Sequence, residues 1–301
     1  MTKPSIFYLI DKAAGPTTRS AVRNLLNVRG RGFGVEGILD PFASGLLITA
    51  TGDSTRFLEY FLQFPKTYTA TIRLGQETDT LDFTGTLVKE TPVPRIDSED
   101  LLTTQSRFTG KILQSPPAYS NVRVRGVRAH ELARGGEAAE PSPREVEVHA
   151  LSLHVLAPDA LAMRCRAASG TYIRSLARDI AAQLGTCGHL TALRRIAIGP
   201  WSVSDEAVDA EWGKIAGTIA DFEILDFFPV LNVTADEEIK FLNGNPFVPQ
   251  NKPQLTGILR IAAPQNFLGL GRYDGEKVTV EKVFPTGPGS TYPQWGKSHS
   301  T

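Results

Sequence analysis

Apolar and polar residues alternate in some parts of the chain and recur every three or four residues in others. Residues 68–74 alternate and are rich in β-branched side chains, which predicts a strand. The apolar run 6–10 predicts another strand, followed by a turn and a helix that begins near Thr18. The same patterns predict helices within 53–62 and 97–108, strands at 146–155 and 161–167, and a helix that follows Arg174 and ends near Leu184.

The character of the chain changes after Ile198. An acidic stretch that we expect to be helical extends from there to about Phe228. Beyond it, short apolar runs such as 257–262 are separated by glycines and by Asn-Gly and Asp-Gly pairs, a pattern typical of a small β domain. We therefore predict two units, residues 1–228 and 229–285, followed by a flexible tail, 286–301.

The composition is that of a globular protein. A chain of 301 residues, with 41% hydrophobic and 21% charged residues, can bury a full core. No segment reaches the length of a membrane span, and the first residues lack the layout of a signal peptide, so we expect a cytoplasmic protein. Cys165 and Cys187 lack the spacing of metal ligands, which predicts reduced thiols and excludes a disulfide scaffold.

Charge is distributed unevenly, although the formal net charge is +0. Residues 1–34 hold six basic residues and one acid, and residues 161–200 repeat that balance. Residues 201–240 hold ten acids and two lysines. Local positive charge is what contact with nucleic-acid phosphates requires, so this distribution favours RNA bound on one face, with solvated charge scatter as the alternative.

One stretch, residues 35–47, places a carboxylate in an unusual backbone setting. Gly37 and Gly45 permit backbone angles that other residues rarely adopt. Pro41 fixes its own φ and disfavours the helical region for Asp40. A defined turn therefore presents the Asp40 carboxylate, although Asp-Pro taken alone is typical of an ordinary turn.

The residues from Gly37 to Gly45 resemble the signature G-T-L-D-P-x-A-[ST]-G of the TruB family of pseudouridine synthases. Further matches follow in the order of that family and extend the resemblance over roughly residues 6–198. They are Asp11-Lys12 with Gly15, Lys66-Thr67-Tyr68, Arg73-Leu74-Gly75, Thr78-Asp79-Thr80, Gly170-Thr171-Tyr172-Ile173-Arg174 and Leu193-Arg194-Arg195.

The resemblance implies an α+β architecture, the pseudouridine synthase fold, with a mixed and mostly antiparallel central sheet flanked by helices. Residues 1–228 would form the catalytic domain, and residues 118–145 would form an RNA-binding thumb inserted in it. Residues 229–285 resemble the small PUA-like β domain of bacterial members, with a generic β appendage as the alternative.

The resemblance also assigns roles to individual residues. Asp40 would be the catalytic carboxylate, and Arg174 would pair with it and lower its pKa, keeping it ionised. Tyr68 would stack on the target base, Tyr172 would contact the base and assist removal of a proton from carbon, and Leu193 would form an apolar wall. The remaining expected substrate-binding residues are Lys66, Arg123, Arg125 and Arg128.

The implied function is isomerisation of the T-loop uridine at position 55 of tRNA to pseudouridine. The base would be flipped out of its stack, and the reaction would need no cofactor and no metal. Asp40 would attack the uracil ring or the ribose, or assist glycal formation, and the sequence does not choose among these. We expect tRNA, through its T stem-loop, as the partner, with no membrane, no obligatory protein partner and a monomeric state.

Two departures from the family pattern stand out. Ala13 replaces a proline, and Val35-Glu36 replaces a His-Thr pair whose histidine is associated with RNA-loop engagement. We expect turnover to survive, because that histidine is not the nucleophile. The departures also raise an alternative, a tRNA-binding folding chaperone with weak or lost catalysis. A glycosidase-like hydrolase would require a second acid opposite Asp40, and the sequence identifies none.

Overall fold

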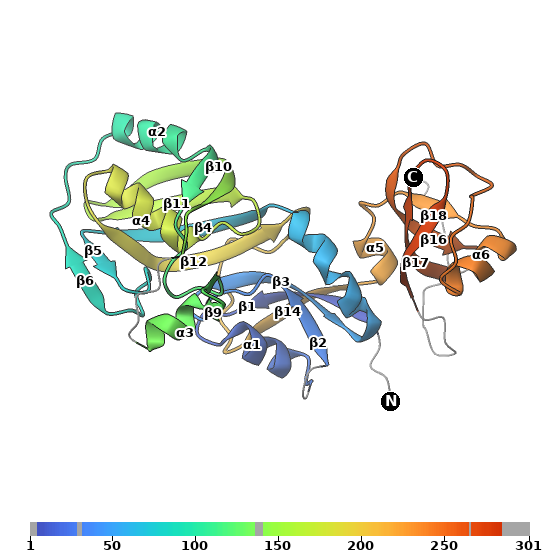
Figure 1. Cartoon of the computed structure of the whole chain (residues 1–301). Coiled ribbons are helices and arrows are strands. Elements are labelled where there is room, and N and C mark those ends of the chain that lie inside the picture. Colours follow the sequence, from blue (N-terminus) through green and yellow to red (C-terminus); the bar gives the residue numbers. More distant parts are fainter. Residues whose placement is uncertain (1–4, 29–31, 136–140, 265, 285–301) are drawn as a thin grey trace, which may run out of the picture.

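The computed structural model describes residues 5–28, 32–135, 141–264 and 266–284. Within these residues the chain forms a large sheet and a separate C-terminal sheet (Figure 1). Along the large sheet the strands are β14 (Gly213–Ile219), β1 (Ile6–Lys12), β3 (Ser44–Thr51), β12 (Gly188–Ile198), β4 (Lys66–Leu74), β11 (Ala160–Ala167), β10 (Arg144–Ala157) and β7 (Gly110–Gln114), while β2 (Phe33–Glu36) pairs with β3 and β13 (Trp201–Ser202) pairs with β12.

The centre of the large sheet is the parallel pair β3 and β12, and the other pairs are antiparallel. The expected mixed, mostly antiparallel sheet is therefore confirmed. Gly45 of β3 has a φ of +108° and lies directly against Arg195 of β12, so that a Cβ at position 45 would lie 2.2 Å from the Arg195 carbonyl oxygen. Only glycine allows the two strands to approach this closely.

Helices and two small hairpins surround the large sheet. In α4, Leu176 and Ile180 share a face and are fully buried in the main apolar core, which explains the 3.6-residue repeat seen in the sequence. The helices are α1 (Thr18–Leu25), the 3₁₀ helix η1 (Gly52–Gln63), α2 (Ser98–Arg107), α3 (Ala129–Arg134) and α4 (Ile173–Gln183), and the hairpins are β5 (Gln76–Thr78) with β6 (Leu87–Glu90) and β8 (Arg123–Val124) with β9 (Val127–Arg128).

The prediction of an acidic helical region between Ile198 and Phe228 was wrong. This stretch contains β13, turns and the edge strand β14, and its one helix is the short α5 (Asp221–Ile224). β14 pairs antiparallel with β1, from Phe7 opposite Ile219 to Lys12 opposite Gly213. The acids of this stretch lie outside β14, and pairing with the edge of β1 gives residues 213–219 a strand conformation that the acidic composition of the whole stretch does not indicate.

The C-terminal sheet is small and separate in its pairing. Its strands are β15 (Val230–Asn232), β16 (Gly257–Ala263), β17 (Asn266–Tyr273) and β18 (Val278–Val283), accompanied by α6 (Ala235–Leu242). An apolar cluster joins it to the larger part, because Phe267 and Phe284 pack on Phe57 of η1 with ring centroids 6.2 and 5.6 Å away. This arrangement agrees with the expected PUA-like unit, and the predicted tail lies outside the described residues.

Candidate active site

The loop that carries Asp40 is clamped at both ends by one arginine. Gly37, with a φ of +66°, opens the loop after β2, and Gly45 closes it at the start of β3. The buried Arg195 donates from Nη2 to the Gly37 carbonyl at 2.7 Å and from Nε to the Leu46 carbonyl at 2.8 Å. A planar guanidinium therefore fixes the separation of the two ends of the loop.

Lys12 holds the middle of the same loop from beneath. Its ammonium donates to the carbonyls of Ala13, Pro41 and Ala43 at 2.8, 3.1 and 2.6 Å. Burial lowers the pKa of Lys12 to about 8, while the nearby Asp40 carboxylate acts in the opposite direction. Lys12 thus supplies hydrogen bonds to three backbone carbonyls, of which that of Pro41 also accepts from the Gly15 amide at 2.8 Å.

The first turn of α1 completes the support. Thr17 caps the helix by accepting from the Ser20 amide, which confirms the expected helix start. The Thr18 hydroxyl then exchanges two hydrogen bonds with the Leu39 backbone, at 2.9 Å to its carbonyl and 3.0 Å from its amide. The residue immediately before Asp40 is thereby tied to a helix.

Arg174 binds the Asp40 carboxylate through two separate nitrogens. Nε lies 2.9 Å from Oδ2, and Nη2 donates to Oδ1 at 3.2 Å. The remaining donors of this buried arginine bind the carbonyls of Thr80 at 2.7 Å and Tyr119 at 3.0 Å. The structure therefore brings together the carboxylate and the arginine that the sequence paired, and fixes both.

A second carboxylate, Asp82, lies behind this pair. Its Oδ2 is 3.7 Å from Arg174 Nη1, and its Oδ1 accepts from the amide and hydroxyl of Thr84. Sequence reasoning did not identify Asp82 as a site residue, although it follows the matched Thr78-Asp79-Thr80 segment by two positions. What marks Asp82 as a site residue is its burial next to Arg174, and a local sequence motif does not reveal burial.

The pKa of Asp40 is set by burial and by three neighbouring charged groups. Burial raises the pKa of the Asp40 carboxyl above its ordinary value, and Asp82 raises it further, whereas Arg174 and Lys12 oppose this. The Asp40 side chain retains 38% of its exposure, so solvent and a substrate can reach it. Arg174 therefore lowers the Asp40 pKa against the desolvation cost, and the net direction of the pKa shift is upward.

Tyr68 and Leu193 lie on the neighbouring strands β4 and β12. Tyr68 is opposite Arg195 in the strand register, and Leu193 is opposite Ala70. Leu193 is buried in the main apolar core and Tyr68 packs against the same core half-buried. Burial raises the pKa of Tyr68, while its interaction with Arg195 opposes the rise.

Tyr172 stands at the N-terminus of α4, two residues before Arg174. Its amide donates to Gln114 Oε1 at 2.8 Å, and its carbonyl accepts from Gln114 Nε2 at 3.1 Å. The Arg144 guanidinium lies over its ring, 5.1 Å from the centroid. Tyr172 is therefore held two residues before Arg174, the residue that binds Asp40.

The remaining expected substrate-binding residues fall into two groups. Arg123, Arg125 and Arg128 are exposed on the hairpin of β8 and β9, where an RNA can reach them. Lys66 is buried and forms an ion pair of 3.0 Å with Glu36, so the structure gives it internal partners. Arg174 also binds the carbonyl of Tyr119, which lies at the start of the segment 118–145 that contains this hairpin.

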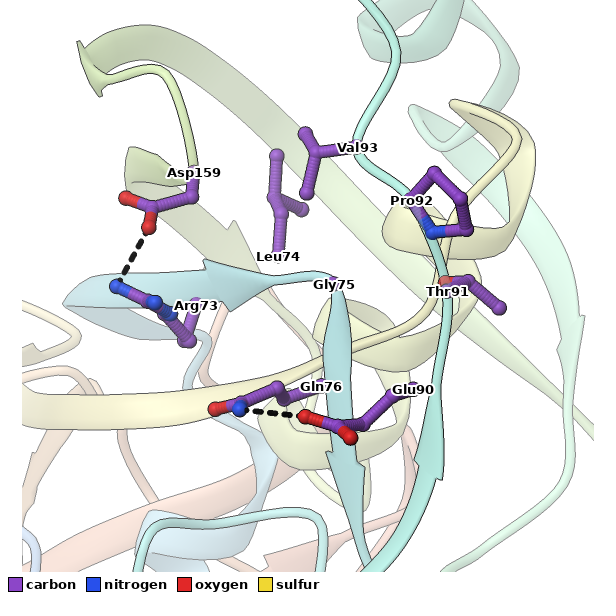
Figure 2. Close-up of a pocket in the computed structure, with 9 residues that line it drawn as sticks. All are labelled: Arg73, Leu74, Gly75, Gln76, Glu90, Thr91, Pro92, Val93 and Asp159. Atoms are coloured by element: carbon purple, nitrogen blue, oxygen red, sulfur yellow. Dashed lines mark hydrogen bonds and ion pairs between the residues drawn. The ribbon is translucent and has the colours of Figure 1, made fainter.

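An open hollow of about 370 Å³ lies elsewhere, between the end of β4, the hairpin of β5 and β6, and the turn after β10 (Figure 2). Its polar side chains are paired with one another, Arg73 with Asp159 at 2.8 Å and Gln76 with Glu90 at 2.9 Å. The hollow does not include Asp40. Its polar rim is therefore already satisfied without a ligand.

Within the described part of the chain, no cluster of three or more His, Cys, Asp or Glu residues is arranged to hold a metal ion. Both cysteines are buried and free, as expected. Over the same residues, no helix has the length and apolar character needed to cross a membrane.

Comparison with known proteins identifies the family. The model of the TruB family pseudouridylate synthase N-terminal domain matches residues 23–173. The tRNA pseudouridine synthase B of Thermobifida fusca (strain YX) is 38% identical over 266 residues, covering 83% of this chain and 89% of the relative. That of Azoarcus sp. (strain BH72) is 36% identical over 290 residues, covering 93% and 95%. The chain therefore belongs to the TruB family of pseudouridine synthases.

Solved structures support the fold. A chain of the structure described as an H/ACA RNP bound to a substrate RNA containing 2′-deoxyuridine aligns with a TM-score of 0.65 at 20% identity, covering 93% of this chain and 85% of that one. A chain of a Cbf5-Nop10-Gar1 complex aligns with a TM-score of 0.64, also at 20% identity, covering 92% and 84%. The architecture is thus the pseudouridine synthase fold with a C-terminal PUA-like unit.

Proposed function

We propose that this protein isomerises the T-loop uridine at position 55 of tRNA to pseudouridine. The observation that carries the proposal is the Asp40 carboxylate, bound at both oxygens by the buried Arg174 yet accessible at the end of a clamped loop. Relatives named tRNA pseudouridine synthase B, with identities of 36–38%, support tRNA as the substrate.

The proposed reaction rearranges bonds within one nucleotide. The bond from N1 of uracil to C1′ of ribose breaks, the base turns, and a bond from C5 to C1′ forms. The proton on C5 is lost and N1 gains one, so atoms and electrons balance without an outside reactant. The reaction therefore needs no redox cofactor, and we propose that it uses no metal.

Asp40 provides the ionised carboxylate in this mechanism. It attacks the ring or the ribose, or assists formation of a glycal, and each route requires a deprotonated oxygen at a fixed position. Arg174 holds the carboxylate by two nitrogens and occupies its other donors with backbone carbonyls, so the pair is rigid before substrate arrives. Such preorganisation is the contribution that this geometry makes to catalysis.

The target base must leave its stack to reach Asp40, and unpaired loop RNA bears this cost more easily than a duplex. In this proposal Tyr68 stacks on the flipped base, Leu193 forms an apolar wall, and Tyr172 contacts the base and assists loss of the C5 proton. Support comes from their positions, since Tyr68 and Leu193 lie on adjacent strands and Tyr172 precedes Arg174 by two residues.

The thumb provides the grip on RNA. Arg123, Arg125 and Arg128 are exposed and would neutralise phosphates of the T stem-loop. The thumb comprises residues 118–145 in this proposal, of which 136–140 lie outside the described structure. Its anchorage to Arg174 through the Tyr119 carbonyl joins the grip to the catalytic pair.

The proposal extends to organisation. Residues 1–228 form the catalytic part and residues 229–285 the C-terminal part, a division that the two separate sheets support. The protein acts in the cytoplasm as a monomer without an obligatory protein partner. Light scattering of the purified protein, alone and with tRNA, tests the oligomeric state.

The test is pseudouridine mapping on an unmodified full-length tRNA transcript, with no cofactor added. Wild-type protein yields pseudouridine at position 55 alone, and Asp40→Asn yields none. Tight tRNA binding without product from either protein would instead favour the tRNA-folding chaperone, the alternative raised by Val35 and Glu36. Product at another uridine would agree with pseudouridine formation but would overturn the proposal that position 55 is the target.

A further inference from the structure

Glu36 is a buried acid that the reaction does not use. It ends β2 directly before Gly37, the first residue of the Asp40 loop, and its side chain is 1% exposed. Its carboxylate forms an ion pair of 3.0 Å with the Lys66 ammonium, whose side chain is 5% exposed. Burying two charges carries a desolvation cost, which their attraction repays only when the geometry is good and further hydrogen bonds are made. A buried ion pair is therefore weak evidence of a gain in stability, and a positioning role is the alternative.

Lys66 extends the contact to a second catalytic segment. Its ammonium also donates to the Ser169 hydroxyl at 2.6 Å, and that hydroxyl donates to the Leu62 carbonyl of η1 at 2.5 Å. Ser169 begins the junction that leads through Tyr172 to Arg174 in α4. One ammonium therefore contacts both the residue before the Asp40 loop and the segment before Arg174.

We propose that Glu36 is a positioning residue, which through Lys66 and Ser169 fixes the spacing between the Asp40 loop and the Arg174 segment. The inference rests on the proposed function for its catalytic consequence. We call the contacts from Glu36 through Lys66 to Ser169 the spacing bridge.

The charges around Lys66 explain why an acid is suited to position 36. Burial lowers the pKa of Lys66, Glu36 opposes this, and Arg195 lowers it further. Among the described residues, Glu36 is the carboxylate within ion-pair distance of Lys66. Glu36 therefore opposes the effect of burial and of Arg195 on the Lys66 pKa, and favours the charged form of the ammonium that donates to Ser169.

The arrangement complements the Arg195 clamp. Arg195 joins the two ends of the Asp40 loop to each other, whereas the spacing bridge joins that loop to another part of the chain. Arg144 and Gln114 also hold the junction before Arg174, through Gly170 and Tyr172, but they lie on β10 and β7, and β2 pairs with β3. Loss of Glu36 is thus expected to shift the two segments relative to each other without opening either one.

The experiment compares Glu36→Gln, Lys66→Met and the double variant with wild type on unmodified tRNA, under single-turnover conditions. Asp159→Asn, which breaks the surface pair with Arg73 on the same strand β4, is the control. Correct folding of each protein is checked by thermal melting, and the tRNA Kd is measured separately from the rate at saturation.

We expect Glu36→Gln to lower the saturating rate about 10–100-fold while the tRNA Kd stays unchanged, because misplacement affects reaction geometry more than RNA grip. The double variant should be no slower than the slower single variant, since both changes break the same bridge. Because the double variant leaves neither Glu36 nor Lys66 as a buried charge without the other, it keeps the test open if a single variant fails to fold.

A Glu36→Gln protein that is folded and reacts at the wild-type rate would overturn the inference. So would a rate loss that only follows the folded fraction, because that is a purely structural effect. Absence of product from wild type would refute the proposed function instead, and the bridge then remains testable by hydrogen exchange. Glu36→Gln should speed exchange at residues 37–47 and 169–174 and leave β16–β18 unchanged; identical exchange in both proteins would overturn the bridge.

Discussion

Arg174 Nε lies 2.9 Å from Asp40 Oδ2, and Arg174 Nη2 lies 3.2 Å from Oδ1, although the two residues are 134 positions apart in the sequence. Each carboxylate oxygen therefore has its own nitrogen. This geometry orients the carboxylate as well as neutralising it, and the orientation depends on the planar fork of the guanidinium.

Removal of the Asp40 charge should separate catalysis from binding. We expect Asp40→Asn to give no detectable pseudouridine while it binds tRNA as wild type does, because the amide has nearly the same shape but is no nucleophile. Product mapping and filter binding on one tRNA transcript measure the two properties. Measurable turnover by a verified Asp40→Asn preparation would exclude Asp40 as the essential carboxylate.

Arg174→Lys keeps the positive charge but loses the fork. A lysine cannot reach both Asp40 oxygens and the carbonyls of Thr80 and Tyr119 together, so we expect a saturating rate about 10²–10³-fold lower. The matched control is Arg164→Lys, at an exposed arginine that pairs with Asp205. Equal rates for the two variants would show that charge alone is sufficient at position 174.

The saturating rate should fall at acidic pH as Asp40 becomes protonated, and the position of this acid limb of the pH profile should depend on Asp82. Because Asp82 raises the pKa of Asp40, Asp82→Asn should move the acid limb of the saturating rate to lower pH. The amide still accepts from Thr84, which preserves the local turn. Single-turnover rates across the acidic range measure the shift, and a limb that moves to higher pH would contradict the assigned cause.

The raised pKa of Asp40 also determines how the stability of the folded protein depends on pH. A carboxyl whose folded-state pKa is above its unfolded value of 3.8 binds its proton more tightly when folded. Its stabilising contribution is present below the unfolded pKa and is lost as the pH rises through the folded pKa. The stability of wild type relative to Asp40→Asn should therefore decrease over that interval, as urea unfolding at several pH values would show; an increase would reverse the assigned direction.

The thumb arginines should control affinity and its salt dependence. Replacing Arg123, Arg125 and Arg128 by alanine should weaken tRNA binding and reduce the slope of log K against log salt by about 0.7–0.9 for each phosphate that is no longer neutralised. The saturating rate should change little. Arg95→Ala with Arg107→Ala, two exposed arginines outside the thumb, is the control, and an equal loss of affinity there would mean that the effect is only net charge.

Gly45→Ala should destabilise the centre of the sheet. Its Cβ would meet the Arg195 carbonyl oxygen at 2.2 Å in a backbone conformation with a φ of +108°, so strain and overpacking together should cost about 2–6 kcal/mol. Gly185→Ala is the matched control, because its φ of +79° is also positive but no atom lies within 4 Å of the new Cβ. For Gly45→Ala, denaturant unfolding should give a free energy of unfolding that is well below that of Gly185→Ala.

The sequence by itself determined the local features of the site. Glycines permit and Pro41 restricts the backbone angles around Asp40, and the Gly170–Arg174 motif precedes a predicted helix, whereas the pairing of Asp40 with Arg174 was implied by the resemblance of both segments to the TruB family. Strands such as β4 and β11 followed from alternation, since a sheet face is a local period of two.

Tertiary structure decided what depends on burial and on distant neighbours. It gave Lys66 a buried partner in Glu36, placed Asp82 near Arg174, and set the net upward direction of the Asp40 pKa shift, because desolvation is set by everything packed around a group. It also turned residues 213–219 into a strand, because pairing with β1 satisfied backbone groups that composition does not describe. Long-range packing has no local signature, so these features appear only once the chain is folded.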